Sequence, residues 1–396
     1  MSGNTGRKIR VLTFVGYYLP GYKAGGPLRT LANMAEHLDD SIEFWIITSD
    51  RDQGDVERYS SVNMDTWQKV GNTNVFYMRP EHRTVCKFAD IISSTPHDVI
   101  YLNSYFDPVF TFKPLLGNYF IKSSRKPVIL APRGEFSKAA LSIKKFRKAF
   151  FIKLMSFLYK GLYFQASSIY EQEDILRALP WVREKNSIIA IDLPAKLEPM
   201  KHTNSDIPKD SVTLNIIFLS RISRMKNLNY ALEVLKDVKS KILFDIYGPQ
   251  EDSTYWEECE HIIKSLPGNI KASYKGNVFP EHVKSTFSRY DLFFLPSKGE
   301  NYGHVIAESI SVGTPVLLSD NTPWRDLRKE GVGWDIPLNS PSTFVSIIED
   351  YASLSNKERE MNRAKVYGKA VQMLTDESAI NSNRQLFLSV LDTDTI

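Results

Sequence analysis

Short apolar runs separated by helix-like stretches constrain the fold of this chain more than any other feature. Such runs occupy residues 44–47, 99–102 and 128–131 in the first half and 244–247 in the second. Parallel strands need a long crossover connection between them, and a helix usually provides it. The alternation therefore predicts an α/β fold with parallel sheets that are covered by helices.

The length of the chain indicates two domains. Its 396 residues are more than one hydrophobic core usually holds. Apolar residues make up 42% of the chain and charged residues 24%, which argues against disorder and leaves enough material for two cores. A polar stretch at 195–210 marks the boundary. We predict one domain over 1–195, a second over 196–375, and a C-terminal helix over 376–396.

Two carboxylates, Glu300 and Glu308, flank a predicted junction between a loop and a helix, with seven residues between them. Gly303 permits a tight turn there, so Glu300 precedes the helix and Glu308 lies inside it. A helix start exposes backbone N–H groups that suit a phosphate, and flanking carboxylates can accept hydrogen bonds from sugar hydroxyls. The segment predicts a site for a phosphorylated sugar. The alternative is a pair of solvated carboxylates.

The residues around the two glutamates complete a strand, loop, helix and strand. An apolar run at 290–296 ends in the glutamate loop, and another follows at 313–318. Ligands of open parallel sheets collect at such carboxyl ends. The segment resembles the family 4 glycosyltransferases, which are retaining enzymes that use nucleotide sugars and share two glutamates separated by seven residues. The matching positions are Pro296, Ser297, Glu300, Gly303, Glu308, Gly313, Pro315 and Val316, with Tyr302 where phenylalanine is usual.

Two cations follow another predicted strand at 214–220. Arg221 offers a planar fork to phosphate oxygens and Lys226 a mobile point charge, and each charge-assisted bond contributes about 1.5–3 kcal/mol. The resembled family has a similar segment, in which glycines stand at the positions of Ser220 and Asn227. The two cations are predicted to bind a diphosphate. The alternative is a basic loop without a ligand.

A glycine-rich loop follows the first predicted strand, which covers 9–15. Gly25 and Gly26 stand directly before a helical pattern, where backbone can approach a ligand closely. The loop has neither the dinucleotide-binding spacing nor that of a P-loop. In the resembled family a Gly-Gly loop of the first domain faces the nucleotide sugar. Lys23 and Arg29 are candidates for contacts with phosphate or acceptor, or they are solvated loop charges.

The resemblance implies the GT-B fold, in which two Rossmann-like domains with parallel sheets face one another across a cleft. The N-terminal domain would bind the acceptor and the C-terminal domain the nucleotide sugar. The helix over 376–396 would cross back to the first domain or cap the second. The segment 191–195 departs from the family's usual hinge. Donor contacts are implied for Glu308, Gly25, Gly26, Gly248, Tyr302, Gly303 and His304, and catalytic roles for Glu300, Arg221 and Lys226.

Fewer residues define the acceptor side. Many relatives carry a histidine after the strand equivalent to 99–102, but this chain has Asn103 there, so a general-base histidine is not expected. Arg133 follows the next strand, where it would contact a phosphate or a neighbouring carboxylate. Asn103, Arg133 and Arg29 are the predicted acceptor-side residues.

Metal and disulfide chemistry have no support in the sequence. Cys86 and Cys259 are solitary, and the seven histidines form no cluster. Asp50 and Asp52 follow a strand and are predicted to be solvated, as is the terminal segment 392–394. Cationic side chains and a helix start can neutralise a leaving diphosphate. We therefore predict no metal and no cofactor besides the nucleotide sugar.

A basic segment over 138–160 is rich in aromatic residues and contains no acidic residue. Such a helix binds anionic lipid headgroups, which predicts a peripheral membrane contact, or it is a core helix with a solvated basic face. The apolar run near the N-terminus is too short to span a bilayer, so a cytoplasmic location is expected. A net charge of +4 is too small to indicate nucleic-acid binding.

The predicted function is that of a retaining glycosyltransferase. It would move a sugar from a nucleotide diphosphate sugar, with a UDP-sugar favoured, to a saccharide or lipid-linked saccharide acceptor. A role in bacterial surface polysaccharide assembly follows from analogy with the resembled family. Two other classes stay open: a sugar-nucleotide epimerase or phosphorylase of the same fold, and a non-catalytic partner subunit.

Overall fold

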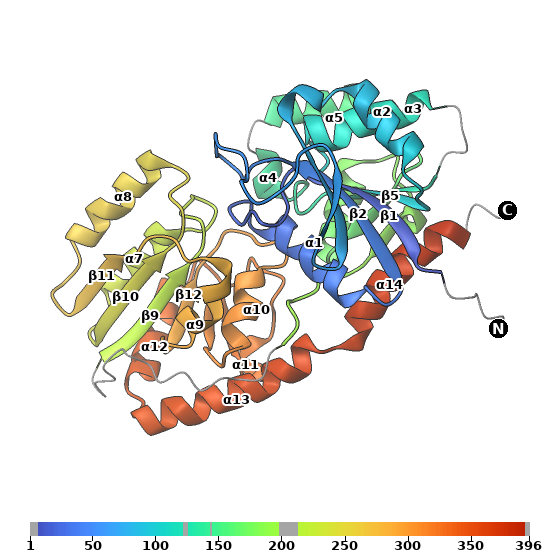
Figure 1. The fold of residues 1–396 in the computed structure, drawn as a ribbon. Coiled ribbons are helices and arrows are strands. Elements are labelled where there is room, and N and C mark those ends of the chain that lie inside the picture. The colour runs from blue at the N-terminus through green and yellow to red at the C-terminus, as the bar shows by residue number, and fades with distance from the viewer. Residues whose placement is uncertain (1–6, 122–125, 143–144, 198–212, 393–396) are drawn as a thin grey trace. The chain divides into compact units, whose positions relative to one another are not determined.

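The chain forms two compact units in a computed structural model that describes residues 7–121, 126–142, 145–197 and 213–392. The first unit contains residues 1–196 and 377–396, and the second contains residues 197–376 (Figure 1). Most of the predicted boundary stretch, 195–210, lies outside the described residues, as does most of the terminal segment 392–394.

The first unit is built on an eight-stranded sheet with the order β3-β4-β2-β1-β5-β6-β7-β8. Neighbouring strands pair in parallel, except that β3 is antiparallel to β4. The inner strands are buried along almost their whole length, as expected for a sheet covered on both faces. The strands are β1 (Ile9–Phe14), β2 (Ile42–Ser49), β3 (Trp67–Val70), β4 (Thr73–Met78), β5 (Val99–Asn103), β6 (Val128–Ala131), β7 (Tyr163–Ala166) and β8 (Ser187–Ile189).

Helices cover both faces of this first sheet. One face packs against α2 (Val85–Ser94), α3 (Lys113–Phe120), α5 (Lys145–Tyr159) and α6 (Ile169–Ala178), through a core that includes Phe88 and Tyr159. The short helix α4 (Lys138–Ser142) precedes α5. The opposite face packs against α1 (Gly26–His37) and α14 (Glu377–Asp392).

The C-terminal helix α14 belongs to the first unit although it follows the second unit in sequence. Its Phe387 is fully buried and makes edge-to-face contacts with Phe44 and Tyr101, with ring centroids 5.8 and 5.4 Å apart. Arg384 donates hydrogen bonds to the carboxylate of Asp40 near the end of α1. Apolar and polar contacts therefore both fix this helix on the first sheet.

The second unit is built on a six-stranded parallel sheet with the order β11-β10-β9-β12-β13-β14. Its strands are β9 (Thr213–Leu219), β10 (Lys241–Tyr247), β11 (Ile270–Tyr274), β12 (Leu292–Leu295), β13 (Val316–Ser319) and β14 (Gly333–Ile336). Its helices are α7 (Leu228–Lys236), α8 (Ser253–Lys264), α9 (Val283–Phe287), α10 (His304–Ile310), α11 (Leu327–Glu330), α12 (Pro341–Ala352) and α13 (Asn356–Leu374).

The predicted fold class is confirmed, because both units are α/β with parallel sheets of the Rossmann-like kind. Every apolar run that the sequence analysis assigned to a strand overlaps a strand of one of the two sheets. The predicted helix after Gly303 is α10, and the predicted helix after the Gly25-Gly26 loop is α1. The periodicity of the apolar residues was therefore enough to predict these elements.

Candidate functional site

The strand order of the second sheet brings two loops next to each other. β9 and β12 are parallel neighbours, with β10 and β11 on one side and β13 and β14 on the other. The loops that leave their carboxyl ends, 220–227 and 296–303, therefore emerge side by side. In open α/β sheets, ligands bind at this point, where the strand order reverses its direction.

Lys226 and Glu300 meet between these two loops. The Nζ atom of Lys226 lies 2.6 Å from Oε1 of Glu300. The two side chains are only 12% and 8% exposed, so each would be costly to bury without the other. Two residues that the sequence analysis drew from separate motifs thus form one charged pair at the reversal point.

Hydrogen bonds hold the backbone on both sides of this ion pair. The Asn227 side chain donates from Nδ2 to the carbonyl oxygen of Pro296 at 3.0 Å. The amide of Lys298 donates to the carbonyl oxygen of Met225 at 2.8 Å. Asn227 has a φ of 62°, a left-handed conformation that asparagine tolerates better than most residues. The two loops therefore form one connected structure.

Arg221 extends from the end of β9 toward the loop that follows β10. Its Nη1 atom lies 2.6 Å from Oε1 of Glu251, and both side chains are partly exposed. Exposed ion pairs contribute only about 0–1 kcal/mol, so a phosphate can replace this carboxylate at little cost. Arg221 is therefore a cation whose carboxylate partner is readily exchanged.

The loop after β10 closely approaches the loop after β9, and Gly248 leaves room for this approach. Its φ is 129°, and a Cβ atom there would lie 1.9 Å from the carbonyl oxygen of Ser220. Any other residue would displace the backbone directly before Arg221. The predicted donor residue Gly248 thus has a structural reason to be glycine.

The loop before α10 gathers three more of the predicted donor residues. Gly303 is the N-cap of α10 with a φ of 83°, and the rings of Tyr302 and His304 lie 4.8 Å apart. Trp324 donates from Nε1 to the carbonyl oxygen of Tyr302 at 2.6 Å. Glu308 follows one turn later in α10 and is partly buried. Trp324 was missed in the sequence analysis, although its place in the loop after β13 is a signal that could have found it.

In the first sheet the strand order reverses between β1 and β5. Gly25 is the N-cap of α1 with a φ of 72°, and Gly26 is the first residue of that helix. A Cβ atom at Gly26 would meet nothing within 4 Å, so space next to this turn is open. Arg29 lies in the first turn of α1 and is partly buried. These three residues are therefore together at the carboxyl end of the first sheet.

The expectation that Asp50 and Asp52 are solvated is wrong. Asp50 is buried and accepts hydrogen bonds from Arg51 and Arg83. Asp52 is buried as well, and its carboxylate accepts hydrogen bonds from backbone amides of the glycine-rich loop, including that of Lys23 at 3.1 Å. Both aspartates shape the loops around the carboxyl end of the sheet, and sequence spacing alone does not reveal such tertiary partners.

Arg133 differs most from its predicted acceptor-side role. Its side chain is only 6% exposed, and its Nη1 atom lies 2.6 Å from Oδ1 of Asp192. Its Nη2 atom donates to the hydroxyl of Tyr101 at 2.6 Å and to Oδ1 of Asn103 at 2.8 Å. A contact with a neighbouring carboxylate, the alternative in the sequence analysis, is what the structure has. Protein partners engage the guanidinium, which corrects the expected contact with an acceptor phosphate.

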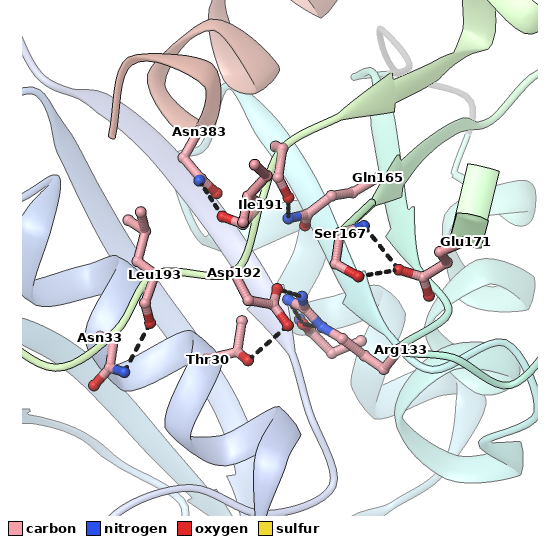
Figure 2. Close-up of polar contacts among 12 residues, drawn as sticks. Thr30, Asn33, Arg133, Gln165, Ser167, Glu171, Ile191, Asp192, Leu193 and Asn383 are labelled. Carbon is pink, nitrogen blue, oxygen red and sulfur yellow. Dashed lines mark hydrogen bonds and ion pairs between the residues drawn. The ribbon is translucent and has the colours of Figure 1, made fainter. Parts of the chain in front are cut away.

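The pair of Arg133 and Asp192 anchors the segment 191–193, whose backbone the sequence left unpredicted (Figure 2). Thr30 of α1 donates to Oδ2 of Asp192 at 3.2 Å. The carbonyl oxygen of Leu193 accepts from Asn33 at 2.8 Å, and that of Ile191 accepts from Asn383 of α14 at 2.7 Å. Three elements thus hold this segment to the first unit.

Burial and charge act together in this network. Burial alone would lower the pKa of Arg133, but the adjacent oxygens of Tyr101 and Asp192 raise it. Burial raises the pKa of Glu171, an effect that hydrogen bonds from Ser167 partly offset. The guanidinium therefore stays charged and needs its counter-ion.

Asn103, one of the predicted acceptor-side residues, has a polar side-chain atom that forms no hydrogen bond with the described residues. Its Oδ1 accepts from Arg133, while its buried Nδ2 has no hydrogen-bond partner among the described residues. Ser104 and Arg133 follow neighbouring strands and have φ values of 127° and 56°. Such strained backbone persists where surrounding structure enforces it, often at functional sites. These features mark the carboxyl ends of β5 and β6.

Neither a metal-binding cluster nor a membrane-spanning helix occurs among the described residues. No group of three or more His, Cys, Asp or Glu residues within 7–121, 126–142, 145–197 and 213–392 is arranged to hold a metal ion. In the same residues, every helix is too short or too polar to cross a membrane.

The chain is similar to several known proteins. Residues 202–367 match the family model described as glycosyl transferases group 1. The chain is 22% identical over 415 aligned positions to alpha-monoglucosyldiacylglycerol synthase of Streptococcus pneumoniae, covering 97% of this chain and 89% of that protein. It is 27% identical over 266 residues to an uncharacterized 41.2 kDa protein in the cps region of Klebsiella pneumoniae, covering 64% of this chain and 69% of that protein.

Solved structures show the fold. The crystal structure of Anabaena HepE in complex with UDP and glucose has a TM-score of 0.68 at 15% identity, covering 96% of this chain and 99% of that chain. The fold is that of GT-B glycosyltransferases. Together with the family match over residues 202–367, this fold supports the assignment of the chain as a glycosyltransferase.

We expect Gly248→Ala to destabilise the second unit. A Cβ atom next to the Ser220 carbonyl oxygen and an unfavourable φ should together lower the free energy of unfolding by about 3 kcal/mol. Chemical denaturation followed by circular dichroism measures the change. The matched control is Gly268→Ala, because a Cβ atom at Gly268 would meet nothing within 4 Å. Equal stability of the two variants would contradict the close approach of Gly248 to the Ser220 carbonyl group.

We expect Asp192→Asn to lower the free energy of unfolding by about 3 kcal/mol, because it leaves the buried guanidinium of Arg133 without a counter-ion. Asp40→Asn removes an exposed partner of Arg384 and should cost at most about 1 kcal/mol. Urea titrations of both variants make the comparison. Similar losses would show that burial does not set the energy of the first pair.

Proposed function

We propose that this protein is a retaining glycosyltransferase that takes a sugar from a UDP-sugar and transfers it to a saccharide or lipid-linked saccharide acceptor. HepE, which shares the fold, has been crystallised with UDP and glucose and with UDP-glucose. A nucleotide sugar as donor is supported by these complexes and by the family match.

The observation that carries the proposal is the buried pair of Lys226 and Glu300 at the reversal point of the second sheet. Family 4 glycosyltransferases, which the segment resembles, have a glutamate and a lysine at these motif positions. Arg221 and Gly248 lie at the neighbouring strand ends of the same sheet. We infer that Arg221 and Lys226 bind the diphosphate and that Glu300 contacts the attached sugar.

In the proposed reaction the anomeric C–O bond to the diphosphate breaks, and the acceptor oxygen bonds to the anomeric carbon on the same face of the sugar. The proton of the acceptor hydroxyl passes to the departing phosphate. Negative charge accumulates on the departing diphosphate, which Arg221 and Lys226 would stabilise. Glu300 would contact the donor sugar as it becomes oxocarbenium-like, and Glu308 would bind the ribose hydroxyls. Tyr302, Gly303 and His304 would line the donor site. Because these two cations would neutralise the leaving group, we propose that no metal ion is needed.

The first unit is proposed to bind the acceptor. Asn103 offers a buried amide without a partner among the described residues. The turn at Gly25-Gly26, which would face the donor, has open space next to Gly26. Arg29 lies beside that turn, whereas Arg133 supports the site from inside the core. We propose a cytoplasmic enzyme of bacterial surface polysaccharide assembly, which the relative in a cps region supports. The relative named as a glucosyldiacylglycerol synthase supports a lipid-linked acceptor.

A thermal-shift panel tests the donor site. UDP should raise the melting temperature, because a ligand at about 100 times its Kd stabilises the folded state by about 2.7 kcal/mol. GDP, ADP and dTDP should have smaller effects, and EDTA should not change the response to UDP. A chain that no nucleotide stabilises would contradict the proposal and favour a non-catalytic partner subunit. Product from a nucleotide sugar without acceptor would favour an epimerase, and dependence on free phosphate a phosphorylase.

Two substitutions separate the proposed roles of the ion pair. Lys226→Ala should weaken UDP binding by roughly tenfold to a hundredfold, because it removes a charge-assisted bond to the diphosphate. Glu300→Gln should bind UDP within about threefold of the parent protein but lose the parent's extra affinity for a UDP-sugar over UDP. Isothermal titration calorimetry measures both quantities without an acceptor.

Lys236→Ala is the matched control for these substitutions. Lys236 pairs with Glu233 on the exposed side of α7, in the same unit. The control should bind UDP as the parent does. If Lys226→Ala binds UDP equally well, the diphosphate does not contact that lysine.

A further inference from the structure

The helix α5 carries apolar residues on two of its sides. Its inner side packs Phe151, Ile152 and Met155 against the core of the first unit, where Leu158 and Tyr159 are buried. A surface helix normally needs one apolar stripe to pack on its domain. The inner residues already provide that stripe, so the remaining apolar residues of α5 need another explanation.

Those remaining residues form an exposed row along the outer side of α5. Phe146, Phe150, Leu154 and Phe157 are spaced by four, four and three positions, which places them on one helix face. The exposed side chains of Tyr119 and Phe120 continue the row at the end of α3, which lies beside α5 (Figure 1). We call these six residues the outer apolar patch: Tyr119, Phe120, Phe146, Phe150, Leu154 and Phe157, each between 50% and 89% exposed.

Side-chain contacts join the two parts of the patch. The rings of Tyr119 and Phe157 lie 6.5 Å apart, edge to face, and those of Tyr119 and Phe120 lie 5.7 Å apart. Single exposed apolar side chains are normal on a protein surface. A contiguous group of six large ones, five of them aromatic, instead marks a surface that binds another body.

The charge around the patch identifies the kind of partner. Residues 108–170 contain twelve lysines and arginines and a single acidic residue, so their net charge is +11. Because the whole chain carries +4, all other residues together carry −7. The single acid, Glu135, is directed inward and accepts hydrogen bonds from Ser104 and from the amides of Tyr105 and Phe106. Every charged side chain on α3 and α5, the two helices that carry the patch, is therefore a lysine or an arginine.

Lysine and arginine side chains flank the apolar row on α5 itself. Lys145, Arg147 and Lys153 are exposed, and Lys160 follows the helix in the next turn. Lys153 lies between Phe150 and Phe157 on the same helix face. Aromatic side chains bordered by exposed cations match the interface of an anionic bilayer, where rings insert at headgroup level and cations pair with phosphates.

We propose that the outer apolar patch docks this protein on an anionic lipid membrane. Phe146, Phe150, Leu154 and Phe157 enter the headgroup region, and Lys145, Arg147 and Lys153 contact lipid phosphates. The patch binds lipid through its own surface, without any nucleotide or sugar. This docking is independent of the proposed transferase activity, although it would bring the first unit to a lipid-linked acceptor.

Vesicle co-sedimentation of the full chain tests the docking surface. The parent should bind vesicles of phosphatidylglycerol and phosphatidylcholine about tenfold or more tightly than vesicles of phosphatidylcholine alone, and salt should weaken this binding. Phe146→Ser/Phe150→Ser should lower the binding about tenfold or more. Lys145→Ala/Lys153→Ala should lower binding to the anionic vesicles and leave binding to phosphatidylcholine vesicles unchanged.

The matched control is Val56→Ser/Met361→Ser, which removes two exposed apolar side chains outside the patch and should leave binding unchanged. Far-UV circular dichroism and UDP calorimetry on each variant distinguish a loss of docking from a loss of folding or of the donor site. A parent chain that does not bind anionic vesicles overturns the proposal. Equal vesicle binding by Phe146→Ser/Phe150→Ser and the parent also overturns it. So does a parent protein that forms a dimer without binding vesicles, if Phe146→Ser/Phe150→Ser dissociates that dimer.

Discussion

The parallel pairing of β9 with β12 is the constraint on which the candidate site of the second unit depends. These strands are distant in sequence, yet their pairing sets Lys226 and Glu300, 74 positions apart, at hydrogen-bond distance. The other strands lie on either side of this pair, so their loops diverge from it. A one-residue shift of β12 would turn its side chains to the opposite face and move the glutamate loop away from the lysine. The packing of the sheet therefore fixes the positions of Lys226 and Glu300 at the carboxyl ends of its strands.

The first sheet has the same reversal of strand order, but its charged residues serve a different purpose. There the side chain of Arg133, which follows β6, turns inward and pairs with Asp192. This ion pair holds the segment 191–193 in place. Removing one partner of such a buried ion pair costs more free energy than replacing both partners by apolar residues. The pair is therefore better suited to fixing a conformation than to exchanging ligands. Arg221 differs, because it and its carboxylate partner Glu251 are both partly exposed and the pair is cheaply broken. The same residue type thus has different uses in the two units because burial differs.

The sequence was sufficient to predict the strands and the fold class, because a continuous apolar run such as 292–295 has few other places than the interior of a parallel sheet. It was also sufficient to place Glu300 before a helix, since Gly303 and the apolar spacing define that junction locally. Partners distant in sequence were beyond its reach: the ion pair of Arg133, the burial of Asp50 and the contact of Trp324 with Tyr302 all depend on tertiary packing. The roles of the site residues in catalysis stay predictions.

For the basic segment over 138–160, the sequence allowed a core helix or a membrane-binding helix. The structure shows why spacing could not separate them: both patterns are present on α5, on different sides. Phe151 and Met155 satisfy the core, while Phe146 and Phe150 extend away from it. Apolar residues on two sides cancel in any measure of amphipathicity, so the helix resembles a buried one in sequence although one side is uncovered. Exposing four large apolar side chains brings no gain to folding in water, and adjacent lysines keep such a surface soluble. A chain selected only for a stable fold would have polar residues at these positions, and their apolar character therefore points to a second environment.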